Sequence, residues 1–201
     1  MKIIKEGSLR YERKPLKFEC KNCKTVFEAE KTEYEEFYNE CLPEKRDRIV
    51  KIIRTLQEKG CRVDGFGMQQ HYFMRPNYDE LKRSIEIYAG LGLRLHVTEL
   101  DVSLYTVYET GRPTITDEML QKQYDMYVEL FSIYRQYADV IDSVTTWGVA
   151  DCTTWLDSSA VRIGDFKPDD APTQRKNFPL LFYADHRMRP YTEKIIEDAL
   201  K

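Results

Sequence analysis

Two carboxylates stand at the end of a short apolar segment, and their spacing is the first chemical signal in this chain. The segment Leu93–Leu104 reads LRLHVTELDVSL. On an extended strand, side chains two residues apart leave the same face. The side chains predicted to leave one face of this strand are those of Leu95, Val97, Glu99 and Asp101. A buried strand that is charged only at its carboxyl end is how α/β barrels present catalytic groups. The alternative is a strand running into a loop whose acids are simply solvated.

Two other segments end in residues that could join these acids. Gln69 and His71 are two residues apart, so they are predicted to share a face at the end of one strand. Trp147 and Asp151 are predicted to do so on another, with Trp155 shortly beyond. Parallel neighbouring strands would place all three tips on one rim.

Such a rim would suit a carbohydrate. Sugar rings stack their C–H faces on indoles, amides and acids bind hydroxyl groups, and a pair of acids can cleave a glycosidic bond. Each residue also has a plainer interpretation, because a single histidine is usually structural and a single tryptophan usually belongs to a core.

The elements that would position these residues follow a regular alternation. Apolar positions at helical spacing predict helices over residues 43–60, 76–91, 116–137 and 191–200, and the first two begin at proline and end at or beside a glycine. Between them, strands are predicted near residues 63–69, 93–100 and 143–149. Strands alternating with helices indicate parallel βαβ units with right-handed crossovers.

Composition bounds the class of protein. The chain has 201 residues, a net charge of −3 and 42% hydrophobic residues, which fits one globular domain or an incomplete larger one. The near-neutral balance argues against a nucleic-acid binder, and no apolar run approaches the ~18 residues that would predict a membrane span. The first residues show no secretory signal pattern, so the sequence leaves the cellular location open.

Residues 1–36 differ from the rest, because they begin basic and end acidic. Within them, Cys20 and Cys23 form a CxxC at the tip of a predicted β-hairpin, which looks like the first half of a zinc ribbon. A second pair of ligands at the right spacing does not follow. We therefore expect no bound metal and no cofactor. Cys20 and Cys23 are the candidate ligands, and reduced thiols or an orphan half-knuckle are the alternatives.

Several segments together resemble glycoside hydrolase family 10, the endo-1,4-β-xylanases. VDGFGMQQH (63–71) resembles the family's DGIGMQGH-type signature, and LHVTELDVS (95–103) its nucleophile strand, ITELDVS. VTTWGVADCTTWLD (144–157) is similar to VTFWGLADDHTWLD, and RKNFPLLF (175–182) to NYPLLF. FYNECLPEKRDRIVKII (37–53) is similar to the end of the fifth strand and the following helix. The motifs fall in the family's order, from residue 37 to residue 201.

The resemblance implies a fold and a division of the chain. The family fold is a (β/α)8 TIM barrel, of which residues 37–201 would supply only the end of strand five through helix eight. We thus expect an incomplete α/β barrel, the C-terminal half, with a small unrelated N-terminal hairpin in residues 1–36. Its open edges would allow self-association.

The resemblance also implies roles. Glu99 matches the nucleophile of a retaining reaction, His71 the histidine that hydrogen-bonds it, and Asp101 the acid that orients this histidine. Gln69 matches a substrate-binding glutamine beside the cleavage point. Gln70 departs from the small residue usual at its position, so the loop beside His71 is expected to be shifted.

Trp147 and Trp155 match the indoles of the sugar platform. The implied partner is xylan or a xylo-oligosaccharide, with no nucleic acid and no membrane. The implied activity is hydrolysis of internal β-1,4-xylosidic bonds.

One requirement of that activity is not met by any motif in the sequence. A retaining glycosidase needs a second carboxylate as general acid and base, and the family carries it on strand four, in a WDVVNE-like motif. No such motif is present, so the chain alone is expected to be inactive or weak. The alternative is a non-catalytic carbohydrate-binding remnant or a zinc-ribbon fusion protein. The family is usually secreted.

Overall fold

The computed structural model describes the backbone of residues 2–4, 16–19 and 26–29, and the full residues 40–74, 76–105, 115–157 and 177–201. None of the helices in these ranges is long and apolar enough to span a membrane.

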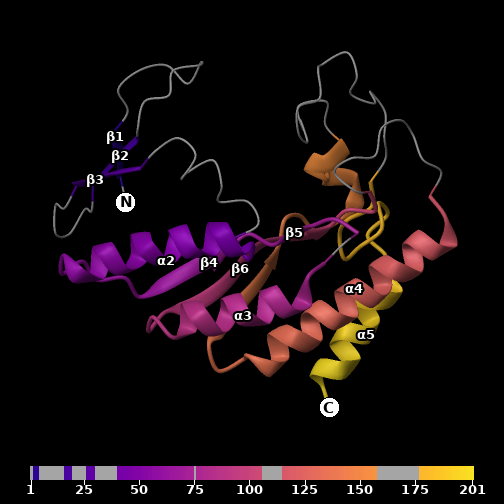
Figure 1. Cartoon of the computed structure of the whole chain (residues 1–201). Coiled ribbons are helices and arrows are strands. Elements are labelled where there is room, and N and C mark those ends of the chain that lie inside the picture. Colours follow the sequence, from indigo (N-terminus) through magenta and orange to yellow (C-terminus); the bar gives the residue numbers. More distant parts are fainter. Residues whose placement is uncertain are drawn as a thin grey trace.

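A parallel sheet occupies the centre of the described residues from 40 onward (Figure 1). Its middle strand, β6 (Arg94–Val102), pairs in parallel with β4 (Gly65–Met68), β5 (His71–Tyr72) and β7 (Ile141–Thr146). β4 and β5 pair with successive parts of β6, and the carbonyl of Gln69 between them accepts from the N–H of Glu99, so β4 and β5 form one interrupted strand. The three predicted parallel strands are therefore confirmed.

Four helices connect or follow these strands, and each begins within two residues of its predicted start. α2 (Pro43–Glu58) and α5 (Pro190–Ala199) have proline in their first turn, where its missing N–H costs nothing. α3 (Tyr78–Ala89) and α4 (Asp117–Gln136) are capped by the side chains of Asn77 and Thr116, which accept hydrogen bonds from backbone N–H groups. In Figure 1, α3 follows α2 along the sheet, and α4 lies beside α5.

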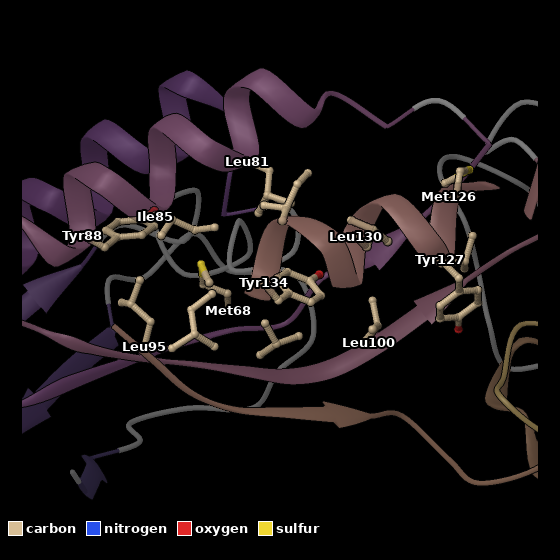
Figure 2. Close-up of a cluster of buried hydrophobic side chains, with 14 of the residues drawn as sticks. Met68, Leu81, Ile85, Tyr88, Leu95, Leu100, Met126, Tyr127, Leu130 and Tyr134 are labelled. Carbon is tan, nitrogen blue, oxygen red and sulfur yellow. The ribbon is translucent and has the colours of Figure 1, made fainter. Parts of the chain in front are cut away.

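The core lies between the sheet and the helices. Figure 2 shows apolar side chains of α3 and α4 meeting those of β4 and β6. Burying one such side chain stabilises the fold by about 1.5–3 kcal/mol. The fully buried members include Met68, Leu81, Ile85, Tyr88, Leu95, Leu100, Tyr127, Leu130 and Ile133.

The N-terminal segment forms a small antiparallel sheet in which β2 (Leu16–Glu19) pairs with β1 (Lys2–Ile4) and with β3 (Val26–Ala29). The predicted hairpin is thus present as β2 and β3, with β1 as an additional strand. Cys20 and Cys23 fall between β2 and β3 and lie outside the described residues.

The predicted parity of β6 is wrong in its second half. Leu95 and Val97 are buried in the core, but so are Leu100 and Val102, which have the opposite parity. The pairing of β6 with β7 shifts register between Val97 and Leu100. This irregularity reverses which residues face the apolar core, so that odd-numbered side chains lie in it before the shift and even-numbered ones after it. Glu99 therefore does not continue the face of Leu95 and Val97.

Two further expectations about strand ends are corrected. The strand carrying Gln69 breaks before His71, because Gln70 adopts a positive φ of 66°. Simple alternation across residues 69–71 is lost there. β7 ends at Thr146, so Trp147 lies just past it, and Asp151 begins a short 3₁₀ helix, η1 (Asp151–Thr153).

Candidate active site

One imidazole joins the two predicted acids. His71 Nε2 lies 3.0 Å from Glu99 Oε2, and His71 Nδ1 lies 2.9 Å from Asp101 Oδ1. His71 and Asp101 are buried, whereas the Glu99 side chain is 22% exposed. The three residues therefore form a hydrogen-bonded chain whose outer end, Glu99, reaches solvent.

Backbone pairing sets this geometry. His71 on β5 is the register partner of Asp101 on β6, so the two side chains leave adjacent positions of neighbouring strands. The N–H of Glu99 donates to the carbonyl of Gln69 at 3.1 Å, which holds the interrupted strand against β6 at this point. The site is built at the carboxyl ends of parallel strands, as expected.

Opposing influences act on the charge of His71. Burial favours the neutral ring, but the hydrogen bonds and negative charges of Asp101 and Glu99 outweigh it and raise the pKa of His71. A neutral imidazole carries one N–H, whereas an imidazolium can donate to both acids at once. The raised pKa thus reflects a ring that gains two charge-assisted hydrogen bonds when it is protonated.

The two tryptophans border the same histidine. Trp155, in the 3₁₀ helix η2 (Trp155–Asp157), has its ring centroid 5.1 Å from that of His71, and Trp147 has its centroid at 6.4 Å. The Trp155 indole N–H also donates to Asp101 Oδ2 at 2.7 Å. Both oxygens of Asp101 are thereby engaged. Trp147 is 46% exposed, which leaves part of its ring open to solvent.

Gln69 also reaches the site. Its Nε2 lies 3.4 Å from Glu99 Oε1, a long contact compared with that of His71. Its own Oε1 is buried and has no hydrogen-bond partner among the described residues. The structure therefore brings together six predicted site residues, which are Gln69, His71, Glu99, Asp101, Trp147 and Trp155.

Asp151, which was predicted to share the rim, is elsewhere. It is buried, forms an ion pair with Arg189, and accepts a hydrogen bond from the N–H of Leu180 at 3.0 Å. Its carboxylate joins the loop after β7 to the segment before α5. Asp151 is a structural anchor in this arrangement.

A second layer of residues behind the site was not predicted. Gln70 is buried and hydrogen-bonds Glu40, Tyr72 and Tyr134. One feature of the sequence pointed to these residues: Gln70 has a long side chain at a position where the family signature has a small residue. The partners could not be found, because Glu40 and Tyr134 are distant from Gln70 in the sequence.

The arrangement can support attack by a carboxylate. Glu99 is a partly exposed acid, one of its oxygens is held by a histidine, and aromatic surfaces lie beside it. No group of three or more His, Cys, Asp or Glu side chains in the described part of the chain is placed to hold a metal ion.

Comparison with known proteins agrees with this geometry. The sequence model of glycosyl hydrolase family 10 matches residues 21–198. An endo-1,4-β-xylanase from Geobacillus stearothermophilus is 40% identical over 163 residues, which are 79% of this chain and 46% of that protein. Endo-1,4-β-xylanase B from Paenibacillus barcinonensis is 41% identical over 157 residues, 76% of this chain and 43% of that protein.

The fold is similar to that of solved structures with the same description. The Thermobacillus composti GH10 xylanase superposes with a TM-score of 0.70 at 43% identity, covering 80% of this chain and 50% of that one. The chain spans about half the length of the curated relatives it matches. The strands and helices from α2 to α5 are accordingly an incomplete (β/α)8 barrel.

Proposed function

Because the chain belongs to glycosyl hydrolase family 10, we propose that its site takes part in the hydrolysis of β-1,4-xylosidic bonds in xylan, with Glu99 as the nucleophile of a retaining reaction. The observation that supports this most is the chain of contacts from Asp101 through His71 to Glu99. This chain of contacts ends on Glu99, which reaches solvent, whereas Asp101 is buried.

The roles follow from the contacts. Glu99 Oε2 is held by His71. Among the described residues, the polar contact of Oε1 is the long one from Gln69, so Oε1 is the oxygen freer to attack the anomeric carbon. The attack forms a glycosyl ester on Glu99 as the bond to the leaving sugar oxygen breaks, and water later cleaves the ester.

Asp101 acts through His71. Its two oxygens are bound by His71 and by Trp155, and the side chain is buried, so it holds the imidazole in orientation and does not meet the sugar. Trp147, with its half-exposed ring beside His71, and Trp155 are placed to stack against sugar rings.

The second carboxylate of the reaction lies outside this set. Protonation of the leaving oxygen requires an acid about 5–5.5 Å from the nucleophile, with access to the substrate. Asp101 does not qualify, because both of its oxygens are engaged. We propose that this chain lacks the general acid and base of the reaction.

The choice of substrate tests this account. General-acid help is worth about 10²–10⁴-fold in rate, and a dinitrophenyl leaving group departs without it. The chain should therefore cleave dinitrophenyl β-xylobioside slowly and xylan hardly at all. The Glu99→Ala variant should lose the aryl xylobioside activity.

A matched control is Glu58→Ala. It removes an exposed carboxylate at the C-terminal end of α2, where the chain leads toward the start of β4, and not at the carboxyl ends of the strands. It should leave the rate unchanged. Full turnover of xylan by the chain would place the general acid within it and contradict the proposal. No cleavage of either substrate, with xylo-oligosaccharides still quenching the fluorescence of Trp147 and Trp155, would instead indicate a carbohydrate-binding protein.

A further inference from the structure

Gln70 combines an unfavourable backbone conformation with a fully used side chain. Its φ of 66° lies in the left-handed region, which favours glycine over residues with a Cβ. Its side chain is nevertheless buried, with 3% of its surface exposed. A non-glycine residue persists in such a conformation only where the surroundings hold it there.

The amide of Gln70 uses both its donors and both its acceptor positions. Nε2 donates to Glu40 Oε1 at 2.8 Å and to Cys41 Sγ at 3.2 Å. Oε1 accepts from the hydroxyl of Tyr72 and from the hydroxyl of Tyr134 at 3.3 Å. An amide offers two N–H donors and two lone pairs, so this one is saturated.

These contacts join three elements at a single point. Glu40 and Cys41 precede α2, Tyr72 lies on β5, and Tyr134 projects from α4 into the core (Figure 2). Burial raises the pKa of the Glu40 carboxyl, and the hydrogen bond from the Gln70 amide opposes this rise by stabilising the charged form. The turn at Gln70 is thus held through its side chain.

The held turn lies between two site residues. Gln69 contacts Glu99 Oε1 and His71 contacts Glu99 Oε2, so both contacts to the carboxylate originate from the residues that flank Gln70. Any rotation of the backbone at Gln70 would move both donors relative to Glu99.

We propose that Gln70 is a positioning residue whose buried side-chain contacts to Glu40 and Tyr134 fix the turn that aims Gln69 and His71 at Glu99. The inference rests on the proposed function for the role of Glu99, but the positioning itself is independent of catalysis. The competing account is that Gln70 is merely tolerated where glycine would serve better.

Substitution by glycine separates these accounts. Gln70→Gly relieves the backbone at positive φ and removes every side-chain contact. If only the backbone mattered, the variant would keep His71 in place and would be at least as stable. If the side chain positions the turn, His71 should lose its contact with Glu99, and its raised pKa should fall toward the ordinary value of 6.5.

The measurement is a pH titration of the imidazole nitrogens by NMR in protein labelled with ¹⁵N-histidine. The chain has three histidines, so His96→Gln and His186→Gln assign the signals of His71. The titration midpoint of His71 is expected to fall in Gln70→Gly, and to fall less in Tyr134→Phe, which removes one of the two hydroxyls and keeps the ring.

Tyr191→Phe is the matched control, because the Tyr191 hydroxyl is also buried but donates to the carbonyl of Leu180. The titration midpoint of His71 in the Tyr191→Phe variant should equal that in the unmodified chain. An unchanged midpoint in Gln70→Gly would overturn the proposal. Since this readout requires no turnover, a failure of the proposed function would leave the positioning test intact. Where the aryl xylobioside is cleaved, Gln70→Gly should also lower kcat/KM, by up to about 10²-fold.

Discussion

His71 lies between two acids, so the hydrogen bonds it can form depend on whether its ring is protonated. The imidazole donates to Glu99 and Asp101 together only when it is protonated. Burial opposes that charge, yet the pKa of His71 is raised. The two acids therefore contribute more to its ionisation than desolvation removes.

The raised pKa has a consequence for stability. A group with a higher pKa in the folded protein stabilises it fully below the unfolded pKa, near 6.5 here, and this contribution is lost as pH rises through the folded pKa. The free energy of unfolding should decline over that window. Urea unfolding at several pH values measures it, and His71→Gln should flatten the decline while His96→Gln should not. An equal decline in all three proteins would contradict the prediction.

Trp155 should matter for stability as well as for sugar binding. Trp155→Phe removes the donor to Asp101 Oδ2 and leaves a buried carboxylate oxygen without that partner. A lost partner of this kind costs about 1–3 kcal/mol. Trp147→Phe, at a half-exposed position, should cost less. Chemical denaturation compares the two, and equal losses would show that the indole N–H of Trp155 is not important.

At the scale of elements, the sequence predicts most of the framework. The four helices, to within two residues of their starts, and the three parallel strands follow from local patterns, because periodicity and helix boundaries depend on neighbouring residues. Glu99, His71 and Asp101 also lie together as predicted, although His71 belongs to a separate short strand, β5. The division of the chain at residues 36 and 37 stays a prediction.

What the sequence could not show depends on contacts between distant segments. The irregularity in β6 belongs to its register with β7, so nothing within LHVTELDVS marks it. The break at Gln70 is held by Glu40 and Tyr134, which are 30 and 64 residues away. Asp151 reads like a site acid in the strand pattern, but its partner Arg189 lies 38 residues further along.

Gly148 follows Trp147 and connects the end of β7 to the loop that carries Trp155. Its φ is 137°, and an added Cβ would lie 2.8 Å from Leu180 Cδ1. Gly148→Ala should therefore destabilise the protein by about 1–3 kcal/mol and shift the fluorescence of Trp147. Gly60→Ala is the control, since its φ is also positive but nothing lies within 4 Å of the added Cβ. Equal effects would mean that the contact with Leu180 is unimportant.

The molecule as a whole presents an exposed strand. Within the described residues, β7 pairs along its length only with β6, and the side chains of Ser143 and Thr145 are exposed. Unpaired strand edges can recruit another chain. We expect concentration-dependent self-association by analytical ultracentrifugation, weakened in Thr145→Lys because lysine blunts such edges. A monomer at every concentration would contradict this.

The identity of the nucleophile can be tested by trapping it. A dinitrophenyl 2-deoxy-2-fluoro-β-xylobioside needs no general acid to form the glycosyl ester, and fluorine slows the water attack that would release it. Mass spectrometry of the digested protein should find one sugar adduct on Glu99, and none in Glu99→Gln. An adduct on Asp101 or another residue, or no adduct while the aryl xylobioside is still cleaved, would contradict the account.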